Sequence, residues 1–415
     1  MKLKEKTYQF LRWLQNYTKT DMVYVAHGSF WWIFGRIFSF LASFLILMAF
    51  ARFATKEVYG AYQYIISMSA MIGLILLPGL DIALIRSVAQ RKEKTFFLCE
   101  KEKLKFGVLA FSVFLIISLW YFIHKNFELT LSFLFAGIFL PLLSIFSLYL
   151  AFWQGRKRFD LQNKYFVAHN LLAALILISF IILKPKIAYI IFGYFFAFTF
   201  STFLFWLLTR KEINRKTEED KEAISYGKHL TIMSIPGSVS AQIDNVIMWQ
   251  FIGPVQVAIY AYALRLVERI SELIPFSALA FPKMAEKNLK EDRVKRSIFD
   301  KFLKLFWFSI PFTIFYILFC PIFFKIFFPA YKESIIYSQV LALTLIFSPF
   351  SFLSTAFLAE VKKRELYILN FAPQILKIIL FFILIPLFGI WGGVSSILIS
   401  QIFFSALTLY FFQKL

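Results

Sequence analysis

The sequence predicts an all-α polytopic membrane protein with about twelve transmembrane helices. Of the 415 residues, 60% are hydrophobic and the mean hydropathy is +0.71, a balance that soluble globular proteins do not have. The apolar residues also form continuous runs of about 20 residues, the length that a helix needs to cross a bilayer. A β-barrel would show short segments of alternating polarity instead. We therefore predict helices, which satisfy their own backbone hydrogen bonds in lipid.

The apolar runs form two groups of six, separated by a hydrophilic linker at residues 209–229. The predicted spans lie at about 29–50, 61–82, 106–124, 130–152, 165–183, 188–208, 230–252, 258–280, 303–324, 334–359, 367–388 and 392–412. This division predicts an amino-terminal lobe over residues 1–222 and a carboxy-terminal lobe over residues 223–415.

The loops between the spans alternate between basic and nearly uncharged. The two termini and the loops on their side, such as residues 86–105, hold 34 of the 45 Lys and Arg residues, whereas the opposite loops hold 7. The positive-inside rule then predicts that both termini are cytoplasmic, which agrees with an even number of spans. Because this topology explains the net charge of +21, no nucleic acid partner is predicted.

The two predicted lobes begin in a similar way. Residues 53–62 follow the first span and residues 251–262 follow the seventh, and both segments lead into a helix through small and aromatic residues. Two lobes of six spans would be parallel repeats, which in transporters bind substrate in a central cavity between the lobes. A chance likeness between Phe-rich segments is the alternative explanation.

Four cations lie within predicted spans, where a charge at the centre of a helix costs about 3 kcal/mol unless it is solvated or paired. They are Arg36, Arg265, Arg269 and Lys377. A chain that keeps these cations is expected to have a polar cavity at membrane depth and an anionic group that binds there. We predict that Asp244 and Glu268 line this cavity with them.

The charges of the eighth span have two interpretations. Arg265, Glu268, Arg269 and Glu272 share one helical face, because their spacing is i, i+3, i+4 and i+7. The acids either compensate the cations inside a packed bundle or orient the guanidinium groups towards a pyrophosphate or an acidic sugar.

Arg36 and Lys377 have no acid within one turn of their own helices. Arg36 either faces the cavity or extends to the cytoplasmic interface. For Lys377, Asp244 of the seventh span is the candidate partner by depth. Asp244 is accompanied by Gln242 and Asn245, so this polar group could instead bind a coupling cation, Na⁺ or H⁺, through its oxygens.

Three further charged residues, Arg52, Asp81 and Arg86, lie near the membrane surfaces and are predicted to be interface anchors or parts of a gate. No catalytic set is predicted, because the chain has neither a nucleophile–base pair in a defined loop nor a phosphate-binding loop. No metal site is predicted either, since the four His and two Cys residues lack ligand spacing. The sequence indicates a transporter rather than an enzyme, with no cofactor apart from a coupling ion.

Several short motifs in the first 90 residues carry a resemblance to a known family. They are Gly35-Arg36, Ala51-Arg52-Phe53, Val58-Tyr59-Gly60-Ala61-Tyr62 and Pro78-Gly79-Leu80-Asp81, followed by Arg86. The chain resembles the polysaccharide branch of the multidrug/oligosaccharidyl-lipid/polysaccharide (MOP) exporter superfamily, and within it the Wzx-type flippases.

This resemblance implies a MATE-like fold and the translocation, by alternating access, of an undecaprenyl-pyrophosphate-linked oligosaccharide such as an O-antigen or capsule unit. It also implies a location in the bacterial cytoplasmic (inner) membrane. The implied partners are an anionic lipid-linked glycan, bilayer lipids and other polysaccharide assembly proteins.

Two related branches are alternatives. Lipid II flippases resemble the chain at Arg36 and Arg52, but they usually carry another arginine where this chain has Ala42, and they tend to have two further spans. Cation-coupled multidrug antiporters share the fold but have cavities built on acids, for which Asp81, Asp244, Glu268 and Glu272 are candidates here.

Overall fold

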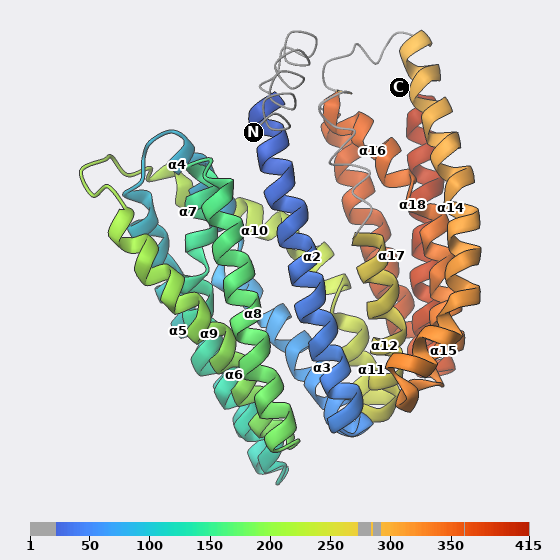
Figure 1. Cartoon of the computed structure of the whole chain (residues 1–415), viewed down its shortest axis with the longest axis horizontal. Helices are drawn as coiled ribbons and strands as arrows, with labels where there is room; N and C mark the ends of the chain where they lie inside the picture. Colours follow the sequence, from blue (N-terminus) through green and yellow to red (C-terminus); the bar gives the residue numbers. More distant parts are fainter. Residues whose placement is uncertain (1–21, 273–283, 285–291, 361, 415) are drawn as a thin grey trace, which may run out of the picture. The chain divides into compact units, whose positions relative to one another are not determined.

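The computed structural model describes residues 22–272, 284, 292–360 and 362–414, and the regular secondary structure in these ranges is helical (Figure 1). Within these residues, ten helical segments are long and apolar enough to cross a membrane, and they correspond to ten of the twelve predicted spans. The prediction of an all-α polytopic membrane protein is confirmed.

The other two predicted spans, 230–252 and 258–280, differ from a continuous apolar helix. The first is divided into α10 (Glu222–Ser240) and α11 (Ile243–Phe251), with a two-residue turn between them. The second corresponds to α12 (Pro254–Glu272), whose charged face lowers its hydropathy. The remaining residues of that predicted span, 273–280, lie outside the described residues.

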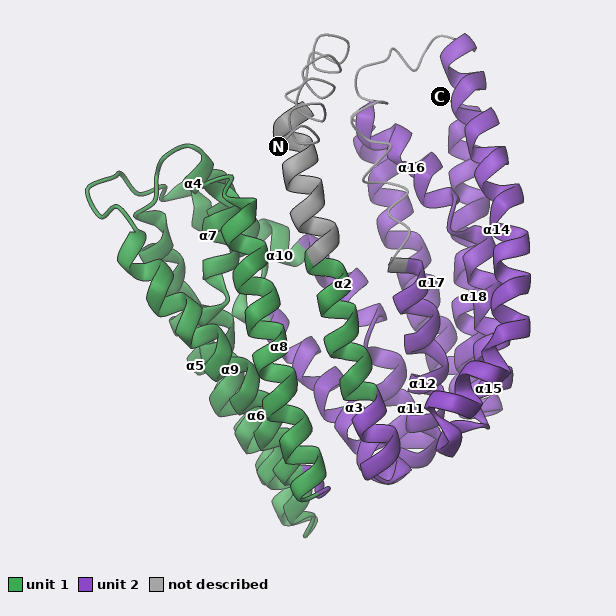
Figure 2. Ribbon diagram, viewed as in Figure 1, with its two compact units in different colours: residues 1–47, 75–184, 188–232 green, residues 48–74, 185–187, 233–415 purple. Residues whose placement is uncertain are grey.

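The chain divides into two compact units, coloured green and purple in Figure 2. The first comprises residues 1–47, 75–184 and 188–232, and the second comprises residues 48–74, 185–187 and 233–415. These units differ from the predicted lobes at three places, since residues 48–74 and 185–187 belong to the second unit and residues 223–232 to the first. The first difference arises because α3 (Lys56–Ile72) packs against α11 and α12.

The first unit consists mainly of six helices. They are α4 (Gly79–Ala89), α5 (Thr95–Ile123), α6 (Phe127–Phe146), α7 (Leu148–Gly155), α8 (Phe159–Leu183) and α9 (Ile187–Glu212). Helices α2 (Met22–Phe53) and α10 and the 3₁₀ turn η1 (Gly73–Leu76) contribute to both units. Helices α5 and α6 pack closely, and Asn126 caps α6 by accepting a 3.2 Å hydrogen bond from the amide of Leu129.

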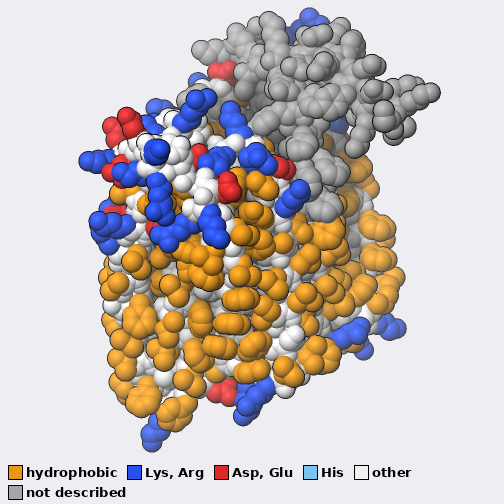
Figure 3. Space-filling view, turned by 60° about the vertical axis from the view of Figure 1, so that its left-hand side comes forward, with side chains coloured by type: hydrophobic (Ala, Val, Ile, Leu, Met, Phe, Trp, Pro, Cys, Tyr) orange, Lys and Arg blue, Asp and Glu red, His pale blue; other side chains and the backbone are white. Residues whose placement is uncertain are grey.

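Helix α5 shows how the apolar residues of the first unit are distributed. Its buried stripe includes Cys99, Lys103 and Gly107 together with aromatic residues such as Phe114, whereas Val108 and Ile116 are exposed. The face of the molecule seen in Figure 3 has a broad hydrophobic band, with most of the visible Lys, Arg, Asp and Glu side chains above it and a few below it. This arrangement suits a helix bundle whose solvent is lipid.

The second unit is built around α3, α11, α12 and the helices that follow them. These are α14 (Asp292–Phe327), η2 (Pro329–Tyr331), α15 (Ser334–Leu341), η3 (Ala342–Phe347), α16 (Phe350–Ala359), α17 (Lys363–Phe388) and α18 (Ile390–Gln413). Helices α17 and α18 pack against each other across a turn at Gly389, whose φ of +61° lies in the region that favours glycine. Helix α17 also packs against α11.

Candidate functional site

A buried polar cluster in the second unit contains Asp244, which lies in the first turn of α11 and is 3% exposed. Its Oδ2 accepts a 2.8 Å hydrogen bond from the hydroxyl of Tyr260 on α12. Its Oδ1 accepts a 2.8 Å hydrogen bond from the backbone amide of Asn245. The break before α11 exposes the first amides of that helix, and a carboxylate in the first turn is favourable there.

Lys377 joins this cluster from α17. The hydroxyl of Ser240 donates a hydrogen bond to Oε1 of Gln374, and Lys377 follows Gln374 by three residues on the same side of the helix. Helix α17 also packs against α11, which has Asp244 in its first turn. The lysine that has no acid in its own helix is thus brought towards the acids of α11 and α12, and its partnership with Asp244 stays a prediction.

Arg265 and Glu268 contribute the second ion pair of the cluster. Nη1 of Arg265 lies 3.1 Å from Oε2 of Glu268, and the two side chains are 28% and 41% exposed. The compensation predicted within this span is thus present, while both groups stay accessible. Arg269 is half-buried on the same helix, and the side chain of Glu272 lies outside the described residues.

The cluster lies at membrane depth. Arg265 is eleven residues from the start of α12, and Lys377 is eleven residues from the end of α17. These two helix ends are neighbours, because a Cβ placed on Gly389 would lie 3.6 Å from Ile252. Both cations are therefore about 17 Å along their helices from the same end, near the middle of a core about 30 Å thick.

Hydrogen bonds connect the cluster to α3. Oγ of Ser67 donates to Oε1 of Gln242 at 3.0 Å and accepts from Nδ2 of Asn245 at 3.0 Å. Nearer the start of α3, the ring of Tyr59 packs on Tyr262 with centroids 4.6 Å apart. Polar and aromatic contacts thus hold α3 against α11 and α12.

Two contacts complete this interface near the start of α3. Nζ of Lys56 lies 3.0 Å from Oε2 of Glu333, the residue before α15. Gly60 faces the backbone of Pro254, where a Cβ would lie 1.9 Å from the carbonyl oxygen, so the close approach requires glycine. We call this set, from Lys56–Glu333 to Ser67–Asn245, the α3 contact.

The remaining predicted site residues have other surroundings. Arg36 is exposed on α2 and belongs to the first unit, whereas Arg52 is exposed in the last turn of α2 and belongs to the second. Arg86 is exposed in the last turn of α4, and its guanidinium carbon lies 5.3 Å from the centroid of the Tyr226 ring. That contact suits an interface anchor.

Asp81 is paired with Lys103. This lysine belongs to residues 86–105, which were predicted to form a cytoplasmic loop. Lys103 instead lies on the buried stripe of α5 and is 1% exposed. Its Nζ lies 2.7 Å from Oδ1 of Asp81 and donates a 3.1 Å hydrogen bond to the carbonyl of Ser144. Asp81, 37% exposed, therefore connects α4 to α5.

Replacing Lys103 by Met is expected to destabilise the protein by about 1–3 kcal/mol, because Asp81 and the Ser144 carbonyl lose their partner. Adding Asp81→Asn should recover part of this loss, since the unpaired charge is then removed. Thermal unfolding of the two single variants, the double variant and the wild type measures the coupling. Strictly additive effects would show that the two residues do not act as a pair.

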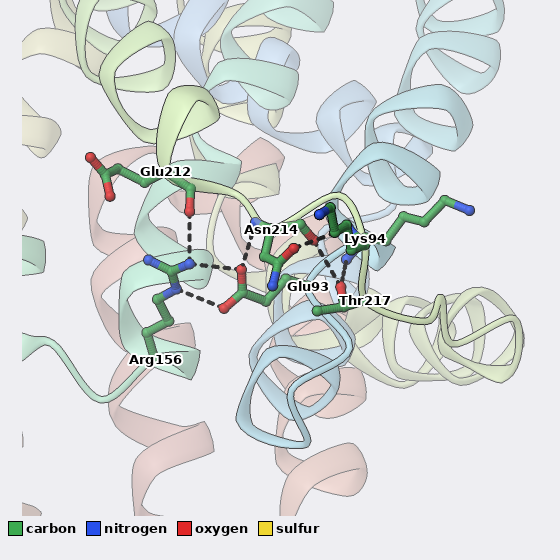
Figure 4. Close-up of polar contacts among 7 residues, drawn as sticks. Glu93, Lys94, Arg156, Glu212, Asn214 and Thr217 are labelled. Atoms are coloured by element: carbon green, nitrogen blue, oxygen red, sulfur yellow. Dashed lines mark hydrogen bonds and ion pairs between the residues drawn. The ribbon is translucent and has the colours of Figure 1, made fainter.

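A second polar cluster attaches the inter-lobe linker to the first unit (Figure 4). Nε and Nη2 of Arg156 donate to the two carboxylate oxygens of Glu93 at 2.8 and 2.7 Å. Oε2 of Glu93 also accepts a 2.9 Å hydrogen bond from the amide of Asn214. Further bonds are Lys94 N to Thr217 Oγ1 at 3.0 Å, Asp220 N to Thr95 Oγ1 at 2.9 Å and Ser87 Oγ to Asp220 Oδ2 at 3.0 Å.

Burial alone would raise the pKa of Glu93, but hydrogen bonds from Arg156 and from the Asn214 amide outweigh it and hold this pKa below its ordinary value. The stabilisation that Glu93 contributes is therefore present at neutral pH. It is lost as the pH falls through the lowered pKa, because the protonated group is a poorer acceptor for Arg156.

Glu93→Gln is consequently expected to speed tryptic cleavage at Arg215 and Lys216 at neutral pH, since both residues are exposed and their segment loses its attachment. Hydrogen exchange of residues 213–220 should differ between wild type and variant at pH 7, and the difference should shrink below pH 4.5, the ordinary pKa of Glu. Glu218→Gln, at an exposed position of the same linker, is the control. Equal cleavage of all three proteins would contradict the attachment.

A comparison with family profiles decides the family. The profile described as "Polysaccharide biosynthesis protein" matches residues 25–288, which is more than half of the chain. The chain belongs to this family. A search of curated proteins finds no match to this chain.

Solved structures resemble this polysaccharide biosynthesis protein over nearly its whole length. An outward-facing multidrug resistance MATE family transporter of the MOP superfamily has a TM-score of 0.63 at 14% identity, covering 92% of this chain and 93% of its own. The lipid II flippase MurJ, in an inward closed conformation, has a TM-score of 0.69 at 14% identity, covering 93% and 87%. A MOP superfamily transporter from Pyrococcus furiosus has a TM-score of 0.55 at 14% identity, covering 92% and 94%. These likenesses establish the MATE-like fold.

Three charged residues of this polysaccharide biosynthesis protein were not predicted from the sequence, namely Glu93, Lys103 and Arg156. The burial of Lys103 could have been predicted from helical spacing, because Lys103 lies four residues from both Cys99 and Gly107 on the buried stripe of α5. Glu93 and Arg156 had no such signal, since 63 residues separate them and both stand in basic segments.

Proposed function

We propose that the protein is a flippase. It would transfer an undecaprenyl-pyrophosphate-linked oligosaccharide, such as an O-antigen or capsule unit, from the cytoplasmic to the outer leaflet of the bacterial inner membrane. Membership of the polysaccharide biosynthesis protein family over residues 25–288 carries the proposal. A fold shared with MATE transporters and with a lipid II flippase supports it.

The charges at membrane depth suit the head group of such a substrate. A pyrophosphate that leaves water needs cationic partners, and a guanidinium group can bind two of its oxygens at once. Arg265 is oriented by Glu268 at 3.1 Å and is partly exposed, so it can meet a ligand without losing its partner. Arg269 on the same helix and exposed Arg36 on α2 are the further candidates. The neighbouring acids would limit the affinity and so permit release.

In this proposal the protein works by alternating access with both termini in the cytoplasm. Lys56, Pro254 and Glu333 belong to the loops predicted on the outer side, so the α3 contact would close that side. Opening towards the outside would then require α3 to separate from α11, α12 and α15. Bilayer lipids would hold the prenyl chain, and other polysaccharide assembly proteins would receive the glycan.

The experiment is complementation of a strain that lacks this gene. Wild-type protein is expected to restore surface glycan, whereas Arg36→Ala, Arg269→Ala and Lys377→Ala should each reduce it while membrane insertion is kept. Lys325→Ala, at an exposed position near the end of α14, is the matched control. Normal glycan in all three variants would refute the role of these cations, and rescue of a strain lacking its lipid II flippase would point to that substrate instead.

A cation-coupled antiporter is the second candidate, favoured by the buried carboxylate of Asp244 at membrane depth. It predicts drug efflux that depends on Na⁺ or protons and is lost in Asp244→Asn. Efflux from vesicles containing the purified protein distinguishes the two functions.

A further inference from the structure

The surroundings of Asp244 raise the question of what balances its charge. A buried carboxylate at membrane depth is retained in ionised form where a cation compensates it, and in transporters a coupling Na⁺ or a proton can do so. We propose that the ammonium group of Lys377 is the permanent counterion of Asp244 and takes the place of a coupling cation. The consequence for translocation, that no Na⁺ or proton is bound at Asp244 during the cycle, rests on the proposed function.

The backbone fixes the position of Lys377 relative to Asp244. Helix α17 packs against α11, and the Ser240–Gln374 hydrogen bond sets their register. Lys377 follows Gln374 by three residues in α17, and Asp244 follows Ser240 by four residues across the turn before α11. The side chain of Lys377 is half-buried, and its Nζ lies 5.8 Å from the centroid of the fully buried Phe381 ring.

The other groups around Asp244 leave little reason for a free cation to bind. Both carboxylate oxygens already accept hydrogen bonds, from Tyr260 and from the Asn245 amide. Helix α12 also contributes Arg265, which interacts electrostatically with Asp244, and Glu268, which is paired with Arg265. The side chain by which α3 joins this site, Ser67, is neutral. A Na⁺ ion at Asp244 would therefore meet two fixed cations, while the second nearby carboxylate, Glu268, is already paired with Arg265.

Removing the ammonium group should create a cation site. In Lys377→Met the carboxylate of Asp244 would need either Na⁺ or a proton. Its melting temperature in detergent should then rise when NaCl replaces choline chloride, or rise on acidification between pH 8 and pH 5. A rise of about 3 °C is expected once the cation is well above its dissociation constant.

The comparison uses full-length purified protein, with Na⁺ and protons as the probes. The melting temperature should not rise with Na⁺ in the wild type, in Lys377→Arg or in the double variant Lys377→Met/Asp244→Asn. The wild type and the double variant should also show the same dependence of melting temperature on pH. Lys325→Met removes a lysine charge elsewhere and should behave as wild type. Lys377→Gln replaces Lys377→Met if the latter does not fold.

The proposal is overturned if wild type shows a Na⁺- or proton-dependent rise that Asp244→Asn abolishes, a test that needs no lysine variant. It is also overturned if the neutral Lys377 variant responds to neither cation. Because these measurements require no glycan substrate, their outcome is independent of whether the protein is a flippase.

Discussion

Crosslinking α3 to the segment before α15 is expected to stop export of surface glycan almost completely. Lys56→Cys and Glu333→Cys replace an ion pair of 3.0 Å, so a short bifunctional thiol reagent can span the two positions. The reason is mechanical, because the α3 contact would have to open once in each transport cycle. A reagent with a cleavable disulfide should restore export after reduction.

The design requires a background without other thiols, so Cys99→Ala and Cys320→Ala are included, both positions being buried. Each single-cysteine protein, treated with the same reagent, is the control and should keep its activity. Export should fall in proportion to the crosslinked fraction seen on a gel. Full export by fully crosslinked protein would show that the α3 contact stays closed throughout the cycle.

Gly60→Ala is expected to lower the stability of the protein strongly. The new Cβ would lie 1.9 Å from the carbonyl oxygen of Pro254, a backbone atom that a side-chain movement cannot displace. Overpacking of this kind costs about 1–3 kcal/mol or more. Each kcal/mol should lower the melting temperature by about 2–4 °C.

Gly237→Ala is the matched control, since this glycine is also helical and a Cβ there would have no atom within 4 Å. It is expected to be neutral or to stabilise α10 by up to about 1 kcal/mol, because alanine favours helices. In a Ser67→Cys background, Gly60→Ala should also increase labelling of the cysteine by an impermeant reagent added outside the cell, since Ser67 is otherwise buried. Equal melting temperatures for the two alanine variants would contradict the close packing of α3 and α12.

The membrane character and ten of the spans were predictable because each depends on local composition. The similar depth of Arg265 and Lys377 was also accessible, since counting residues from a short outer turn gives the depth of a side chain. By contrast, the membership of α3 in the second unit depends on the fit between Gly60 and the Pro254 backbone, which no property of either segment reveals alone.

The burial of Lys103 shows a second limit of sequence patterns. A lysine near the end of an apolar run has the same composition signature whether it reaches water or turns inward to Asp81. Its orientation follows from helical phase, which places it in line with Cys99 and Gly107. The charge rules that predict membrane topology count such a residue without regard to that phase.

The pairing of charges in the second unit has a consequence for the response to membrane voltage. Glu268 and Arg265 form one pair without net charge, and Asp244 with Lys377 would form a second under the proposal above, so their movement as a unit would do no work against the transmembrane field. The field would then act mainly on the remaining charges, including those of the substrate. When an anion moves outward across an inside-negative membrane, its free energy falls by about 2.3 kcal/mol per charge for each 100 mV. Under the proposed function, the voltage would drive an anionic head group outward.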